Sequence, residues 1–217
     1  MNEVVVALEE GIETPAFLDV PESARGVVLF AHGSGSSRHS PRNRFVASEL
    51  GAGKFATLLF DLLTPREDAI DRRTGELRFD IGLLAGRLIG ATRWAHAQPA
   101  LANLTTGYFG ASTGAAAALV AAATLPDRIG AVVSRGGRPD LAGRHLREVR
   151  APTLLIVGGA DDVVLKLNRE AASQMRAHCE LVVVPRATHL FEEPGAIAEV
   201  AGHARAWFNR FLTPACA

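Results

Sequence analysis

Cysteine and lysine are both scarce in this sequence. The two cysteines, Cys179 and Cys216, are too few and too late in the chain to form a disulfide framework, which fits a reducing compartment. Lysine occurs only at Lys54 and Lys166, so arginine is the default cation of this chain. The sequence therefore excludes a small secreted domain held by disulfides, and we expect a cytoplasmic protein.

A net charge and a long apolar run are absent as well. Lys and Arg together number 23, and so do Asp and Glu, which leaves no basic surplus for nucleic acid or an anionic membrane. The longest weakly polar run, residues 114–125, is too short to span a bilayer. The first ten residues, MNEVVVALEE, lack the basic region and the cleavage signal of an export peptide. We expect neither a nucleic-acid nor a membrane partner.

What the chain does contain is an alternation of apolar runs with helical periods. Its 217 residues, 48% of them hydrophobic, are enough for one core, and no repeat or linker divides them, so we expect a single domain, 1–217. The pattern predicts an α/β fold with a mostly parallel sheet of about eight strands and helices on both faces. We expect the strands at 3–8, 14–20, 26–31, 55–60, 106–109, 129–133, 153–157 and 180–184, the first two as an antiparallel edge hairpin. We expect the helices at 43–50, 77–97, 114–125, 166–175 and 197–212, with a brief one at 141–149.

A serine between two glycines follows the fifth expected strand. Residues 110–114 read GASTG, the G-x-S-x-G pattern of a nucleophile elbow, in which small neighbours let the chain turn sharply and expose Ser112. The alternative is structural, with Ser112 simply a small residue where a strand meets a helix. Its position at the carboxyl end of a parallel strand, where such folds place their ligands, favours the nucleophile.

A serine nucleophile needs a base and an acid on later loops that follow strands. His189 follows the last expected strand, and Asp161 and Asp162 follow the one before it, which gives the order Ser, Asp, His. One of the two aspartates is expected to have only a helix-capping or turn role. The loop after the third strand, AHGSGSSRHS, is expected to supply an oxyanion-hole N–H from Ser34, and the other donor is the N–H of Thr113.

These segments together resemble the α/β-hydrolase superfamily, and within it the short, lidless dienelactone hydrolase-like proteins. The residues that carry the resemblance are AHGSGSSRHSPRNR, GYFGASTGAAAAL, SRGGRPDLAG, PTLLIVGGADD and ATHLFEEPGA, which resemble a subset sometimes fused to phosphoribosyltransferase domains. The resemblance implies a serine hydrolase of small ester, thioester or lactone substrates that needs no cofactor or metal, and it favours Asp161 over Asp162. Dienelactone hydrolases themselves have a cysteine where this chain has Ser112.

Two other functions stay open at this point. One is a hydrolase fold kept only for binding or scaffolding, since a filled triad does not prove turnover. The other is a dinucleotide-binding oxidoreductase, suggested by Gly33 and Gly35 after a strand, although Arg38 occupies the place of the third glycine.

Arginines concentrate in the segments that follow strands. Arg42 and Arg135 are the candidates for orienting an anionic substrate, and the alternative is that such arginines pair with local carboxylates such as Glu67, Asp71 and Asp140. The segment 134–152 is too short and polar for a lid, so we expect an open cleft that prefers short acyl chains. The acyl group, the alcohol and the oligomeric state are left open.

Overall fold

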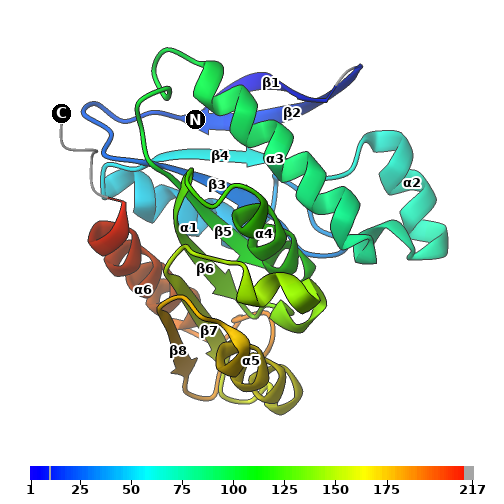
Figure 1. The fold of residues 1–217 in the computed structure, drawn as a ribbon, viewed down its shortest axis with the longest axis vertical. Helices are drawn as coiled ribbons and strands as arrows, with labels where there is room; N and C mark the ends of the chain where they lie inside the picture. Colours follow the sequence, from blue (N-terminus) through cyan, green and yellow to red (C-terminus); the bar gives the residue numbers. More distant parts are fainter. Residues whose placement is uncertain (10, 213–217) are drawn as a thin grey trace.

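The computed structural model describes residues 1–9 and 11–212, which form one eight-stranded sheet with helices on both faces (Figure 1). The strand order is β1-β2-β4-β3-β5-β6-β7-β8. The strands are β1 (Asn2–Glu9), β2 (Ile12–Asp19), β3 (Val27–Ala31), β4 (Ala56–Phe60), β5 (Thr106–Ala111), β6 (Ile129–Arg135), β7 (Thr153–Gly158) and β8 (Cys179–Val184). Strands β3 to β8 are parallel to one another, whereas β2 is antiparallel to both of its neighbours, β4 and β1, and forms the expected edge hairpin with β1. The predicted α/β class is confirmed.

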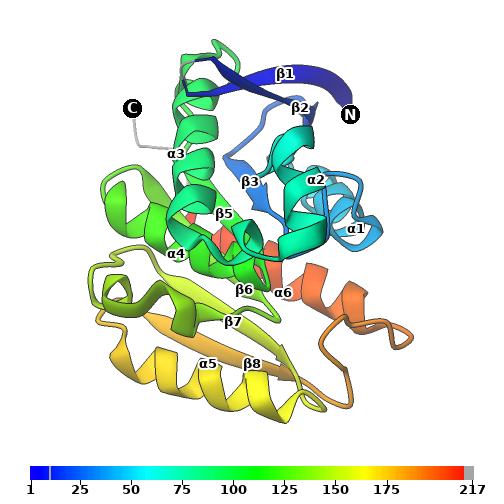
Figure 2. The same cartoon turned by 90° about the vertical axis from the view of Figure 1, so that its right-hand side faces the viewer.

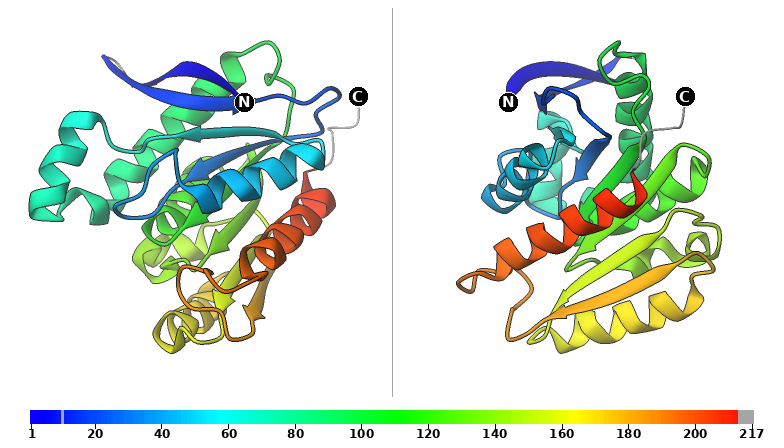
Figure 3. Two further views of the ribbon diagram at one scale, coloured as in Figure 1. Left: turned by 180° about the vertical axis from the view of Figure 1, so that it is seen from behind. Right: turned by 90° about the vertical axis from the view of Figure 1, so that its left-hand side faces the viewer.

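Five longer helices cover the two faces of the sheet. Helices α1 (Pro41–Ala52) and α6 (Ala196–Phe211) pack side by side on one face, as Figure 3 shows from behind. The opposite face carries α3 (Ile81–Ala97), α4 (Thr113–Thr124) and α5 (Asp162–Gln174), which Figure 2 shows in succession along the sheet. This arrangement leaves the carboxyl ends of the parallel strands free of long helices, and the loops of the site lie there.

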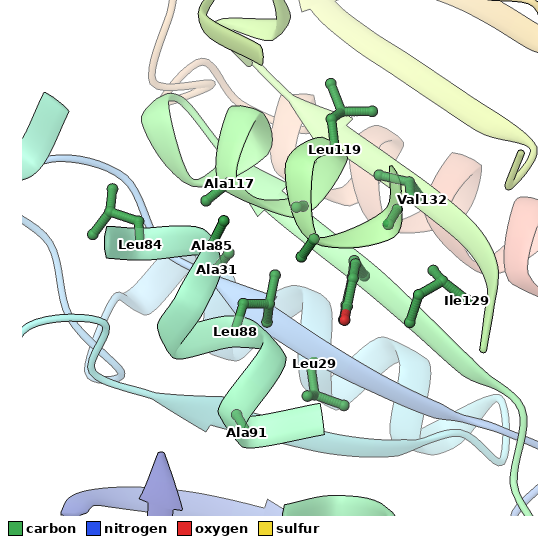
Figure 4. Close-up of a cluster of buried hydrophobic side chains, with 14 of the residues drawn as sticks. Leu29, Ala31, Leu84, Ala85, Leu88, Ala91, Ala117, Leu119, Ile129 and Val132 are labelled. Carbon is green, nitrogen blue, oxygen red and sulfur yellow. The ribbon is translucent and has the colours of Figure 1, made fainter. Parts of the chain in front are cut away.

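The central strands are buried on both faces, which explains their continuous apolar sequences. In β3, Val27, Leu29 and Ala31 belong to the core under α3 and α4, whereas Val28 and Phe30 belong to the core under α1 and α6. Figure 4 shows the first of these cores, where small side chains let the helices approach the sheet closely. Helix α6, the helix predicted at 197–212, likewise buries an apolar stripe that includes Val200, Ala201, Ala204, Trp207 and Phe208.

The segment after β4 differs from the sequence prediction. A helix that the periodicity did not predict, α2 (Pro65–Thr74), is followed by a 3₁₀ turn, η1 (Leu77–Phe79). The predicted helix 77–97 is therefore wrong at its start, because Asp80 breaks it and caps α3 by accepting the N–H of Leu83 at 2.9 Å. Helix α2 has too few apolar residues for a hydrophobic stripe, but it carries a capping box between Thr64 and Glu67.

Smaller differences concern helix ends. Helix α5 begins at Asp162, four residues before the predicted start, and the brief helix predicted at 141–149 is a 3₁₀ segment, η2 (Pro139–Arg147), interrupted at Gly143 by a φ of 53°. Within residues 1–9 and 11–212, no helix combines the length and apolarity needed to cross a membrane. Cys179 is a free thiol, and Cys216 lies outside the described residues.

Candidate active site

Ser112 lies on a strained turn between β5 and α4. Its φ of 50° and ψ of −121° are unusual for a residue with a side chain, and although it occupies the N-cap position of α4, its hydroxyl caps no backbone N–H. The glycines on either side make the turn possible. A Cβ on Gly110 would lie 2.4 Å from the Ala115 Cα, and one on Gly114 would lie 2.2 Å from the Ala31 carbonyl oxygen.

The end of β6 holds this turn in place. The Ser112 N–H donates to the Arg135 carbonyl at 3.3 Å, and the Arg138 N–H donates to the Ser112 carbonyl at 3.1 Å. These backbone bonds keep the serine in its strained conformation, so its side chain is free of any capping role.

His189 and Asp161 are brought together across two loops. The Nδ1 atom of His189 lies 2.7 Å from Oδ2 of Asp161, while Oδ1 of Asp161 accepts the Val164 N–H at 3.3 Å and so caps α5. Asp161 therefore makes both the capping contact and the histidine contact, which the sequence analysis had divided between two aspartates. Asp162 is an exposed residue in the first turn of α5.

Backbone hydrogen bonds fix the loop that carries His189. The Gly159 N–H donates to the Val184 carbonyl at 2.8 Å, and the Ala160 N–H donates to the Ala187 carbonyl at 2.9 Å. Phe191, two residues after His189, is only 1% exposed and anchors the far side of the loop in the core. The pairing of these two loops positions the imidazole beside the end of β7.

His189 and Ser112 both border the segment at the end of β6. A Cβ on Gly136 would lie 3.0 Å from the His189 carbonyl oxygen and 3.6 Å from its Nδ1, and the preceding residue, Arg135, binds the Ser112 N–H. Among residues 1–9 and 11–212, no hydrogen bond joins the Ser112 hydroxyl to the His189 ring. Such contacts are often long in sites without substrate.

The loop after β3 lies against the elbow. A Cβ on Gly33 would be 2.9 Å from the Ser112 Cβ, and the Ser34 and Thr113 hydroxyl oxygens are 3.1 Å apart. His32 supports this loop from beneath: its Nδ1 lies 3.0 Å from the Gly33 carbonyl oxygen, and its Nε2 accepts the Leu62 N–H at 3.0 Å. Burial lowers the pKa of His32, which agrees with the neutral ring that the Leu62 bond requires.

A cleft of about 410 Å³ opens beside Ser34 and Thr113. Helix α2 and the segment after it form its outer wall, and much of the wall is polar. The charges on it are paired: Arg38 bonds Asp61, the Nε of Arg78 lies 2.8 Å from Asp71, and the Nη2 of Arg72 lies 2.7 Å from Asp68. The charged side chains that line the cleft therefore balance one another.

No family model matches the chain, so its relatives are found by direct comparison. A dienelactone hydrolase from Anabaena variabilis superimposes with a TM-score of 0.93 at 56% identity, over 97% of this chain and 98% of that one. The chain belongs to the dienelactone hydrolase-like α/β hydrolases. Est1E from Butyrivibrio proteoclasticus shares the fold at a TM-score of 0.80 and 15% identity, over 97% of this chain and 98% of its own.

Two proteins from strains of Mycobacterium tuberculosis are also similar to this hydrolase. Each is 58% identical to it over 207 residues and is named "Putative phosphoribosyl transferase". The match covers 95% of this chain but only 46% of each relative, so the chain spans about half the length of the curated relatives it matches.

The two candidate substrate arginines of the hydrolase lie together on the α1 side of the site. Arg42, in the first turn of α1, pairs with Glu192 at 2.9 Å, whereas Arg135 is 7% exposed and donates to the Asn43 amide oxygen at 3.4 Å. Burial, followed by the nearby charge of Arg42, lowers the pKa of Arg135 to about 10, so the guanidinium stays cationic at neutral pH.

Sequence reasoning missed two contributors to this site. Helix α2 supplies the outer wall of the cleft, and its signal was the capping box Thr64 to Glu67 with Pro65 at the first position and Gly75 after the last. His32 supports the loop that carries Ser34, but its role depends on its contact with Leu62, a residue thirty positions away. No local pattern could have found that contact.

Proposed function

We propose that this member of a hydrolase family cleaves carboxylic ester, thioester or lactone bonds of small acyl substrates with Ser112 as nucleophile. The observation that carries the proposal is the strained serine, which sits at a helix N-cap and caps nothing. Backbone strain of this kind costs roughly 1–3 kcal/mol and is maintained where a side chain has another use. Holding a partly exposed hydroxyl at the end of a parallel strand is the use we infer.

In the proposed mechanism, Ser112 attacks the substrate carbonyl while His189 takes its proton. Asp161 accepts the hydrogen bond from Nδ1–H of His189, which leaves Nε2 as the ring nitrogen that faces the serine and receives the proton. The backbone N–H groups of Thr113 and Ser34 stabilise the oxyanion, and the Thr113 N–H belongs to the first turn of α4, where no helical carbonyl accepts it. His189 then returns the proton to the leaving group, and water hydrolyses the acyl-enzyme by the same steps.

The name of the mycobacterial relatives does not change this proposal. Those proteins are about twice as long as the segment that matches, and the same segment aligns from end to end with a dienelactone hydrolase. We infer that the transferase name refers to the part of those relatives that this chain does not match.

Labelling with a fluorophosphonate probe tests the proposed nucleophile. The wild-type protein should form a covalent adduct whose tryptic peptide carries the probe on Ser112, and prior incubation with a 4-nitrophenyl ester should slow its formation. An intact protein that takes up no probe at micromolar concentration would instead support the reading of a fold retained for binding alone.

The size of the cleft predicts the preferred acyl length. Because its volume is about 410 Å³ and several charged side chains line it, added methylenes should gain little of the ~0.8 kcal/mol that each contributes when fully buried. Across 4-nitrophenyl esters, kcat/KM should be highest for acyl chains of about two to four carbons and lower at about eight or more. An efficiency that climbs steadily with chain length, or rises when micelles form, would contradict this expectation.

A further inference from the structure

Arg135 is a buried cation for which the described residues provide no counter-ion. It is 7% exposed, its Nε has no hydrogen-bond partner, and no carboxylate within residues 1–9 and 11–212 forms an ion pair with it. The other arginine buried this deeply, Arg87 at 3% exposed, pairs with both Glu9 and Glu67. Arg135 therefore differs from Arg87, whose buried charge is balanced by two carboxylates.

A second cation lies beside it and increases the imbalance. The charge of Arg42 is close enough to lower the pKa of Arg135, and the Nε of Arg42 is buried without a hydrogen bond. The Glu192 partner of Arg42 is 65% exposed, and pairs of this kind contribute little stability. The one carboxylate paired with either arginine, Glu192, is therefore exposed and contacts Arg42 alone, although burying an uncompensated charge is unfavourable.

The main chain of Arg135 borders Ser112, and its side chain lies near the loop that carries His189. The carbonyl of Arg135 accepts the N–H of Ser112, and its guanidinium carbon lies 5.9 Å from the ring centre of Phe191, two residues after His189. The cleft beside Ser34 and Thr113 is lined by none of Ser112, His189, Arg42 and Arg135. The charged side chains of that cleft are paired, whereas Arg135 is buried without a carboxylate among the described residues.

We propose that Arg135 and Arg42 form an anion subsite that binds an oxyanion group of the substrate, a carboxylate or a phosphate, beside the nucleophile. Arginine suits this role because its planar guanidinium binds such groups through two hydrogen bonds at once. The bound anion supplies the missing counter-charge, and it fixes the scissile carbonyl at Ser112. The use of this subsite in catalysis rests on the proposed hydrolase function, but its affinity for anions does not.

Thermal unfolding with inorganic phosphate tests the subsite without any turnover. Phosphate should raise the Tm of the wild-type protein more than chloride of equal ionic strength does, and Ser112→Ala should keep this shift, because binding needs no nucleophile. Arg135→Met should abolish the shift. It should also raise the Tm measured without phosphate, because it replaces an unpaired buried charge with an apolar side chain of similar volume. Arg44→Met is the matched control, because it removes an exposed charge from the turn of α1 that carries Arg42, and it should keep the shift.

Two further variants keep the test decisive. Glu192→Gln should enlarge the phosphate shift, because it removes the carboxylate that competes for Arg42. Arg42→Met should reduce the shift, and it decides the question if Arg135→Met does not fold. A phosphate shift that is equal in the wild type, Arg42→Met and Arg135→Met would overturn the proposal.

Kinetics distinguish the two oxyanions. Mono-4-nitrophenyl glutarate carries a carboxylate, and 4-nitrophenyl pentanoate is its neutral analogue of the same length. The ratio of their kcat/KM values should fall about tenfold or more in Arg135→Met and stay constant in Arg44→Met. A phosphate shift without any carboxylate preference supports a phosphate-bearing substrate, whereas an unchanged ratio together with an absent phosphate shift overturns the subsite.

Discussion

Two serines in this chain occupy the N-cap position of a helix, and they are used in opposite ways. Ser40 begins α1 with a negative φ of −47°, and its hydroxyl accepts the Asn43 N–H at 3.3 Å. Ser112 begins α4 with a φ of 50°, and its hydroxyl accepts no such bond. Ser40 therefore stabilises its own helix, whereas the hydroxyl of Ser112 makes no capping hydrogen bond to its helix.

Asp161 lies between these two cases. One carboxylate oxygen caps α5, as the Ser40 hydroxyl caps α1, while the other oxygen bonds His189. A residue with two acceptor oxygens can therefore stabilise a helix and orient an imidazole at once, whereas a single hydroxyl that must attack a substrate is better left uncapped.

The largest expected effect separates the two serines directly. Ser112→Ala should lower ester hydrolysis by at least about four orders of magnitude and should abolish fluorophosphonate labelling, with little change in Tm. Ser40→Ala should lose about 1 kcal/mol of unfolding free energy, because it removes a working cap. Initial rates and urea denaturation of both variants provide the measurement, and labelling that persists in Ser112→Ala would refute the assigned nucleophile.

The next effect separates the two neighbouring aspartates. Asp161→Asn should lower kcat by up to about 10⁴-fold, because the amide stabilises the wrong tautomer of His189, while stability changes little since asparagine also caps helices. Asp162→Asn should change kcat by less than about threefold, because Asp162 is exposed at the start of α5. Equal losses in the two variants would mean that the loop as a whole, and not one carboxylate, supports the histidine.

A smaller effect concerns strain. Glycine tolerates a φ of 50°, so Ser112→Gly should gain about 1 kcal/mol of unfolding free energy even though it removes the proposed nucleophile. Ser40→Gly should lose only a few tenths of a kcal/mol, because glycine is itself an acceptable N-cap. Chemical denaturation of the two variants measures these opposite signs, and a loss of stability in Ser112→Gly would show that the elbow is not strained.

The smallest effect is a pH dependence of the loop that lies against the uncapped serine. The folded-state pKa of His32 is lowered from 6.5 by burial, so the unfolded chain binds a proton more readily than the native protein does. The contribution of neutral His32 to the free energy of unfolding is therefore fully present above pH 6.5 and is lost as the pH falls below this value. Tm measured from pH 8 to 5 should decrease less in His32→Gln than in the wild type.

A control is needed because a second histidine has the same tendency. Burial, followed by the charge of Arg128, also lowers the pKa of His96. The His96→Gln variant should keep the part of the decrease in Tm that His32 causes between pH 8 and 5. The variant with both substitutions should show the smallest change in Tm with pH. Identical profiles for the wild type and His32→Gln would exclude His32 as the source.

Most of the sheet could be predicted from the sequence, because the central parallel strands are buried on both faces and therefore read as continuous apolar runs. The strand 153–157 is one example, observed as Thr153–Gly158. Helix α2 could not be predicted from periodicity, since only Asp71 is buried on it and polar contacts to the rest of the chain hold it in place. Its cap signals were present in the sequence, but cap signals without an apolar stripe are weak indicators of a helix.

The sequence by itself determined the alternation of strands and helices, the glycines around Ser112, and the order in which the candidate nucleophile, acid and base follow the strands. These features are local, since apolar periodicity and small residues specify secondary structure and sharp turns within a few positions. Only the tertiary structure decided that Asp161 bonds His189, that His32 supports the loop of Ser34, and that Arg135 is buried without a carboxylate. Such relations depend on distances between separate loops, and those distances are fixed by how the strands are ordered and the helices packed, which no short segment of the chain encodes.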